Sequence, residues 1–209
     1  MQVTSALQMV RSDINNMAKK HGRDPASIKL LAVSKTKPIA LIKAAIEAGQ
    51  RFFGENYPSE GLEKIAALSD VDCEWHFIGS IQSRKAASIA AHFDWVHSVD
   101  RLKVATKLAE NRPPELPPLQ ICLQVNIDNE ESKSGVSPHQ LEALAAQCAE
   151  YPQLRIRGLM AIPAPETEFE KQREAFAKVR ELQVSLARQY TTIDTVSYTH
   201  LTLPTIPLV

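Results

Sequence analysis

Short apolar runs alternate along most of the chain with longer segments in which apolar residues recur every three or four positions. The short runs have the length of buried strands, and the longer segments have the period of amphipathic helices. The pattern therefore predicts strands at residues 28–35, 51–56, 74–79, 95–100, 119–127 and 156–162, with a seventh starting around 193–196. It predicts helices at residues 5–21, 38–49, 59–68, 82–93, 101–110, 137–151 and 166–190.

Residues that commonly begin and end helices support these limits. Pro38 stands at the start of one predicted helix and Gly49 at its end, which is the usual placement of these two residue types. Ser137 stands where the N-cap of a later helix is expected. The proline-rich run NRPPELPP, residues 111–118, predicts a rigid surface loop between a helix and a strand.

The order of the elements predicts an α/β fold. Six β–α repeats with strands apolar on both faces indicate a parallel sheet covered by helices. Such a sheet is either open and doubly wound or closed into a (β/α)8 barrel. No G-x-G-x-x-G motif follows the first strand, which counts against an open sheet that binds dinucleotides. Polar residues gather at the strand ends, the functional face of a barrel, so we predict the TIM-barrel type.

Composition narrows the class of protein. The 209 residues fit one domain, and 24 basic residues balance 24 acidic ones, so charge favours neither nucleic acid nor anionic membranes as partners. Three cysteines without a C-x-x-C pair argue against a disulfide framework and against a metal site. The N-terminus lacks the apolar core of a signal peptide, and no run approaches the ~18 apolar residues of a membrane span. We expect a cytoplasmic monomer.

Lys35, in the run LAVSKTKP, is the polar residue at the end of the first predicted strand. A lysine forms an imine only when its amine is uncharged, and desolvation or a nearby positive charge lowers its pKa. Lys37, two residues further on, is a candidate for that charge. Position alone supports an imine-forming lysine and an ordinary solvated strand-end lysine equally well.

Three further strand residues are candidates for contacts with a ligand. Asn56 ends the second strand beside Glu55, a pair that could orient a ring, anchor a lysine or simply cap a turn. His76 lies inside an apolar strand, where a satisfied core histidine is the more common case. Met160 at a strand end could pack against a flat ligand, although core filling is more common. The charged run NIDNEESKSG is either a lid or a solvated surface loop.

Six segments together resemble one family, the pyridoxal phosphate homeostasis proteins. They occur in the family's order within residues 25–195, and they are LLAVSKTKP, AGQRFFGENY, EWHFIGSIQS, HFDWVHSVDR, NIDNEESKSG and RGLMAIPAP. The resemblance implies a barrel similar to the N-terminal domain of alanine racemase, with pyridoxal 5'-phosphate (PLP) held as a Schiff base on Lys35. We also predict Asn56, His76 and Met160 as contacts of the cofactor. Members of this family look like carriers or regulators in vitamin B6 and amino-acid homeostasis.

The resemblance stops near residue 195. Family members continue with a Ser-Gly-Met-Ser segment and an Arg-Ile-Gly strand, whereas this chain reads VSYTHLTLPTIPLV. That run is similar to the translation of a transposase mosaic-end adapter used in sequencing libraries. We therefore expect an incomplete barrel domain at 1–195, truncated after about six strands plus part of the seventh, and a non-native tail at 196–209. A divergent native terminus is the alternative.

Three functions remain in competition. The first is a non-catalytic PLP-binding homeostasis protein, and the second is a PLP-dependent amino-acid racemase. A racemase needs acid–base groups on both faces of the substrate carbon. In the alanine racemase family the second base comes from an additional β domain, for which 209 residues leave no room. The third is a lyase that would use Lys35 directly on a carbonyl substrate. We favour the homeostasis protein.

Overall fold

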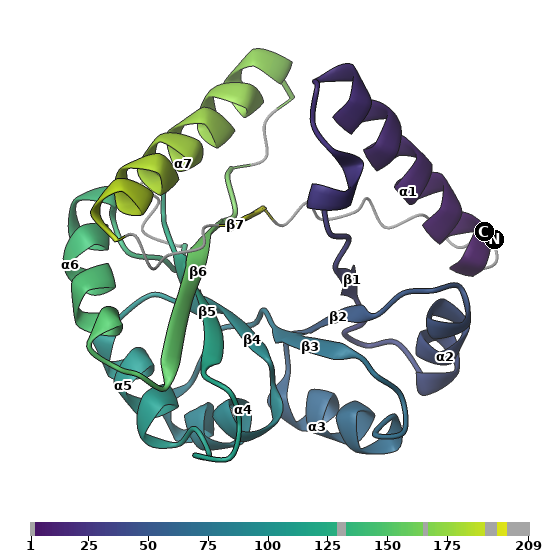
Figure 1. The fold of residues 1–209 in the computed structure, drawn as a ribbon, viewed down its shortest axis with the longest axis horizontal. Helices are drawn as coiled ribbons and strands as arrows, with labels where there is room; N and C mark the ends of the chain where they lie inside the picture. Colours follow the sequence, from purple (N-terminus) through teal and green to yellow (C-terminus); the bar gives the residue numbers. More distant parts are fainter. Residues whose placement is uncertain (1–2, 129–132, 165–166, 191–195, 200–209) are drawn as a thin grey trace. The chain divides into compact units, whose positions relative to one another are not determined.

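The computed structural model describes residues 3–128, 133–164, 167–190 and 196–199, and parallel strands alternate with helices along them (Figure 1). These elements fall into two compact units, one within Met1–Trp75 and the other within His76–Thr205. Each unit has its own parallel strands and its own buried apolar side chains.

The first unit contains two paired strands and three α-helices among its described residues. Its elements are α1 (Val3–Lys20), η1 (Pro25–Ser27), β1 (Ala32–Val33), α2 (Ile39–Glu47), β2 (Phe52–Glu55) and α3 (Pro58–Ala67). β1 and β2 run parallel, with Ala32 opposite Phe53 and Val33 opposite Gly54. The Phe53 ring is buried and lies 5.5 Å from the ring of Trp75. This register aligns the ends of β1 and β2 at one edge.

Helix α1 is held to the end of α2 by one arginine. The Arg11 guanidinium donates to the carbonyl oxygen of Ala48 at 2.8 Å and to the side-chain oxygen of Gln50 at 3.1 Å. Gly49 between them has a φ of +82°, the left-handed conformation in which glycine commonly ends a helix. The prediction that Gly49 ends this helix is therefore confirmed, although the last helical residue is Glu47.

The second unit continues the alternation from within β3. Its elements are β3 (Glu74–Phe77), η2 (Ser83–Lys85), α4 (Ala86–His92), β4 (Trp95–Val99), α5 (Leu102–Glu110), β5 (Leu119–Gln124), α6 (Pro138–Ala149), β6 (Leu154–Ala161), α7 (Phe169–Gln189) and β7 (Val196–Thr199). Each of these strands pairs in parallel with the next. Figure 1 shows α4, α5 and α6 together on one face of β4, β5 and β6.

The core of the second unit explains why its strands read as continuous apolar runs. All five residues of β4 are buried, and so are five of the six residues of β5. Strands covered on both faces have no solvated side on which to place alternate polar residues. The largest fully buried side chains here are Phe77, Phe93, Ile89, Leu108, Leu119, Ile121, Leu123, Leu141 and Leu159.

The predicted strands and helices occur where the sequence pattern placed them, with changes at their limits. The pairing of β1 covers only Ala32–Val33 instead of 28–35, and the turn at Lys35 and Thr36 accounts for its C-terminal limit. Strand β6 begins at residue 154 and contains an irregularity in its pairing with β5, where Gly158 has a φ of +153°. An apolar run shows where a strand is buried, but it does not show where pairing stops.

The starts of α6 and β7 in the second unit can be compared with the limits that the sequence predicted. Ser137 occupies the N-cap of α6 as predicted, but its hydroxyl donates to the side-chain oxygen of Gln140 at 3.0 Å instead of accepting from the helix backbone. Strand β7 begins at Val196 and takes in four residues of the segment predicted to be a non-native tail. Residues 191–195 and 200–209 lie outside the described residues, so the identity of that tail stays a prediction.

Candidate functional site

Lys35 and Asn56 lie at the same edge of the first unit. The amide of Ser34 donates to the carbonyl oxygen of Gly54 at 2.9 Å, which extends the β1–β2 alignment by one residue. Lys35 and Asn56 each come one residue later, immediately after Ser34 and Glu55. Lys35 is exposed and stands in a turn, while Asn56 is half-buried. The structure thus brings these two predicted residues to neighbouring strand ends.

A buried ion-pair network, which we call the Lys64 network, consists of Ser34, Glu55, Glu60 and Lys64. The Lys64 ammonium donates to Glu55 Oε1 at 2.8 Å, to Glu60 Oε1 at 2.7 Å and to the carbonyl oxygen of Ser34 at 2.6 Å. The Ser34 hydroxyl also donates to Glu55 Oε1, at 2.6 Å. Lys64 is 4% exposed and Glu55 is 0% exposed. Charges this far from water are retained only when they are paired and hydrogen-bonded, as these are.

The network continues to Thr36, the residue after Lys35. Glu60 Oε1 accepts a hydrogen bond from the Thr36 amide at 2.6 Å, and the Thr36 hydroxyl donates to the Lys35 carbonyl oxygen at 2.6 Å. Thr36 has a φ of +61°, which is costly for a β-branched residue and persists only where the surroundings impose it. The Lys64 hydrogen bond, together with the Thr36 amide, lowers the pKa of Glu60 despite partial burial. Glu60 is therefore a charged acceptor at neutral pH.

Two buried oxygens at this edge have no hydrogen-bond partner among the described residues. They are Oε2 of Glu55 and Oδ1 of Asn56. A buried acceptor left without a donor costs about 1–3 kcal/mol, so such atoms commonly mark a place where water or a ligand binds. Lys35 is exposed at the neighbouring strand end, and a primary amine together with two such acceptors fits a polar ligand that carries a carbonyl group and hydrogen-bond donors.

His76 and Met160 belong to the second unit, where both are buried. His76 Nδ1 lies 2.9 Å from His97 Nε2, so one of the two nitrogens carries the shared hydrogen. The His76 ring stacks on Trp95, with ring centroids 5.4 Å apart. Met160 packs with Trp95 and Cys122 in one buried cluster. These surroundings are those of core residues, and the roles of His76 and Met160 in cofactor binding stay predictions.

The loop after β5, predicted to be a lid or a solvated loop, is anchored at both described ends. The Asn126 amide donates to the Val136 carbonyl oxygen at 3.0 Å, and Asp128 Oδ2 accepts from the Ala164 amide at 2.6 Å. Gly135 has a φ of +132°, and a Cβ at this position would lie 2.6 Å from the Asn126 nitrogen. Residues 129–132 of this loop lie outside the described part of the chain.

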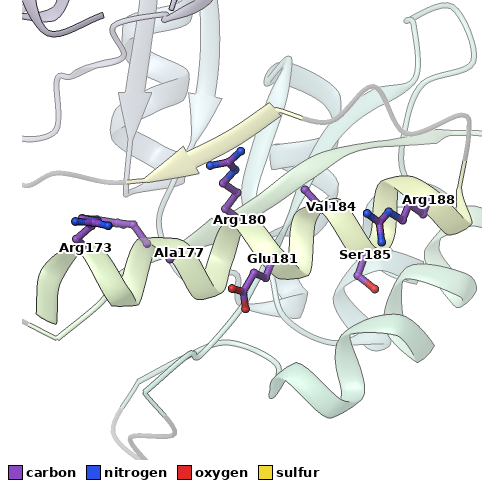
Figure 2. Close-up of a pocket in the computed structure, with 8 residues that line it drawn as sticks. Arg173, Ala177, Arg180, Glu181, Val184, Ser185 and Arg188 are labelled. Carbon is purple, nitrogen blue, oxygen red and sulfur yellow. The ribbon is translucent and has the colours of Figure 1, made fainter. Parts of the chain in front are cut away.

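A surface hollow follows one side of α7 and contains none of the predicted site residues (Figure 2). Its charged residues are Arg173, Arg180, Glu181 and Arg188, and all four are exposed. Exposed side chains on a single helix do not form a preorganised site. Across the described residues, no group of three or more His, Cys, Asp or Glu side chains is arranged to hold a metal ion.

Sequence reasoning missed Glu60 and Lys64. The buried positions on α3 include Gly61 and Lys64, and Leu68 follows directly after the helix. These residues are spaced by three and four, so Lys64 occupies a place in the apolar stripe of the helix. A lysine at such a position is the one sequence feature that could have pointed to the network.

Comparison with known proteins connects this geometry to a family. A family model described as "Alanine racemase, N-terminal domain" matches residues 6–200. The chain belongs to this family. The predicted α/β fold of the (β/α)8 barrel type is thereby confirmed, as is the resemblance to the pyridoxal phosphate homeostasis proteins.

Relatives within the family are similar over most of their length. The pyridoxal phosphate homeostasis protein of Pseudomonas aeruginosa is 54% identical over 184 residues, which are 88% of this chain and 80% of that protein. The protein of the same name from Escherichia coli K12 is 50% identical over 194 residues, covering 91% of this chain and 83% of its own.

A solved structure of a related protein is also similar to this chain over most of its length. PipY of Synechococcus elongatus, determined with PLP bound, is 37% identical with a TM-score of 0.74, and the match covers 87% of this chain and 85% of PipY. In the described part of the present chain, no helix is both long enough and apolar enough to cross a membrane.

Proposed function

We propose that this member of the alanine racemase N-terminal domain family is a PLP-binding protein of vitamin B6 and amino-acid homeostasis. The names of its relatives and the PLP bound to PipY support this function. The observation that carries the proposal is the placement of Lys35. Its amine is exposed at a strand edge, and the residues on either side of it are tied to the Lys64 network.

Lys35 and Asn56 would hold the cofactor at this edge. PLP supplies an aldehyde. The Lys35 amine in its uncharged form adds to the aldehyde carbon, a C=N bond forms, and the carbonyl oxygen leaves as water with the two amine hydrogens. The oxygens of Asn56 and Glu55 that have no partner would accept hydrogen bonds from polar groups of the bound ligand or from water.

The proposed role is that of a carrier or regulator without turnover of its own. It rests on the naming of the relatives as homeostasis proteins. We extend the proposal to a cytoplasmic location, since Cys73, Cys122 and Cys148 are all free thiols, as is usual in a reducing compartment. The monomeric state stays a prediction from the sequence. The alternative, an amino-acid racemase, would need a second acid–base group on the opposite face of the substrate carbon.

The test compares Lys35→Ala with a matched control, Lys43→Ala, an exposed lysine on α2. PLP is added to the whole chain and imine absorbance in the visible range is recorded. We expect the absorbance in the parent and in Lys43→Ala, and its complete loss in Lys35→Ala. Borohydride reduction and mass spectrometry should locate the adduct on Lys35.

The same preparations are assayed for racemisation of alanine. Absence of racemisation with the imine present supports a carrier, whereas turnover that disappears in Lys35→Ala would establish the racemase instead. A parent chain that forms no imine, or a Lys35→Ala variant that keeps it, contradicts the proposed function.

A further inference from the structure

The two residues that flank Lys35 are both tied to one buried ammonium group. Lys64 donates to the carbonyl oxygen of Ser34, the residue before Lys35, at 2.6 Å. It also holds Glu60 at 2.7 Å, and Glu60 accepts from the amide of Thr36, the residue after Lys35, at 2.6 Å. We propose that Lys64 and Glu60 are positioning residues that hold the Lys35 turn in the conformation that presents its amine to PLP. This inference rests on the proposed function.

The network also separates the roles of two lysines. An ammonium group has three hydrogens to donate, and Lys64 has three acceptors within 2.8 Å: Ser34 O, Glu55 Oε1 and Glu60 Oε1. All three hydrogens of the Lys64 ammonium are therefore used in these contacts, and the group is not available to form an imine. Lys35 is exposed and takes no part in these contacts, so it stays the proposed imine-forming lysine.

The strained backbone at Thr36 indicates what the network does. A threonine with a φ of +61° would relax toward the extended region if its surroundings allowed it. The charged oxygen of Glu60 stabilises the strained form by accepting from the Thr36 amide, and the Thr36 hydroxyl bonds back to Lys35 O. Release of this contact would change the direction in which the Lys35 side chain leaves the turn.

A simpler explanation is that the network only holds α3 against β1 and β2. The two explanations differ for Glu60, the more exposed of the two carboxylate partners of Lys64. Its side chain is 26% exposed, whereas that of Glu55 is 0% exposed. Loss of Glu60 leaves Lys64 paired with Glu55, so the fold should survive while the tie to Thr36 is lost.

The experiment compares Glu60→Ala, Glu60→Gln and the control Glu63→Ala, an exposed glutamate on the same helix. We expect Glu60→Ala to raise the PLP concentration for half-maximal imine absorbance about tenfold, the usual effect of losing a hydrogen bond to a charged group. Glu60→Gln keeps an oxygen that accepts from Thr36, so it should remain within about twofold of the parent. Glu63→Ala should match the parent, and urea midpoints should show that all of the variants fold.

A second measurement does not depend on PLP. Hydrogen exchange of the Thr36 amide, followed by NMR without PLP, should be about tenfold faster in Glu60→Ala and near the parent rate in Glu60→Gln. If Glu60→Ala fails to fold, Thr36→Pro replaces it, because proline has no amide hydrogen to donate to Glu60 and cannot adopt a positive φ. Thr36→Pro should weaken PLP binding in the same direction.

The outcomes separate the two proposals. A parent chain that forms no imine refutes the proposed function, while Thr36 exchange still reports on the network. A parent that forms the imine, with folded Glu60→Ala or Thr36→Pro binding PLP equally well, overturns the positioning role. Equal losses in Glu60→Ala and Glu63→Ala would overturn it as well, because the effect would not be specific to the contact with Thr36.

Discussion

The three cysteine thiols differ in their surroundings. Cys122 and Cys148 are buried, and Cys73 is partly exposed. Burial raises the pKa of Cys148 to about 12 and raises that of Cys122 as well, against the opposing effect of Arg157. Partial burial also raises the pKa of Cys73, although the positive charge of Arg51 acts in the other direction. Since the thiolate is the reactive form, burial and a raised pKa both slow modification.

We therefore predict an order of thiol reactivity in the native chain. At about pH 7.5 a disulfide reagent such as DTNB should modify Cys73 first, and slowly, while Cys122 and Cys148 react only after unfolding. Raising the pH to about 9 should speed the Cys73 phase, because more thiolate forms as the pH approaches its raised pKa. Cys73→Ser should remove that phase, and all three thiols should react together in denaturant. Fast modification of two thiols in the native chain would contradict the assignment.

At the scale of single residues, only part of the candidate site could be predicted from the sequence. Lys35 and Asn56 could be predicted because strand ends are visible in the apolar pattern and the family resemblance supplied the chemistry. Lys64 and Glu60 were missed, since a Glu–Lys pair four residues apart on a helix has the spacing of an ordinary exposed pair, and only the place of Lys64 in the apolar stripe hints at its burial. The burial of Lys64 and the left-handed turn at Thr36 are properties of the folded chain.

At the scale of elements, one arginine connects the end of α4 to the start of β5. Arg112 Nη1 donates to the carbonyl oxygens of Ala90 at 2.6 Å and Phe93 at 2.9 Å, and its Nε donates to that of Pro117 at 2.9 Å. Arg112 is 8% exposed. Burial lowers its pKa, with Asp94 acting in the opposite direction, but an arginine stays charged at any pH near neutral. The guanidinium therefore satisfies carbonyl groups at a helix end.

We expect Arg112→Lys to lower the free energy of unfolding by about 1–3 kcal/mol, since an ammonium cannot reproduce the planar set of donors. Arg112→Met should lower the free energy of unfolding by at least as much, because the carbonyl oxygens lose every donor that Arg112 supplies. The measurement is the urea midpoint with its slope. Arg173→Lys, an exposed arginine on α7, is the control and should stay within about 0.5 kcal/mol of the parent. An Arg112→Lys variant as stable as the parent would show that the donor geometry is unimportant.

Arg112 also shows why elements are easier to predict than the contacts between them. The run NRPPELPP predicts a rigid surface loop, and nothing in its composition indicates that its arginine is buried against a preceding helix. Likewise, the apolar run at 28–35 predicted a strand whose pairing covers only Ala32–Val33. Hydrophobic period reports which side of an element is buried, whereas pairing limits and caps depend on partners distant in sequence.

At the scale of the whole molecule, charge is balanced. Lys and Arg total 24, Asp and Glu total 24, and the sequence pI is about 7.0. Molecules without net charge do not repel one another, so association is least opposed when the pH equals the pI. A protein of this composition should therefore be least soluble near neutral pH, where assays of PLP binding would be run.

We predict that the polyethylene glycol concentration for half-precipitation is lowest near pH 7 and rises toward about pH 6 and about pH 8.5. Below its pI of about 7.0 the chain gains protons and carries a net positive charge, and above it the loss of protons leaves a net negative charge. The double variant Lys171→Glu, Arg173→Glu changes two exposed positions on α7. Each substitution lowers the formal net charge by two, so the pH of minimum solubility should move below 7. Urea midpoints of the double variant guard against an effect of unfolding. A solubility curve that is flat, or whose minimum does not move with charge, would mean that apolar contacts rather than net charge govern association.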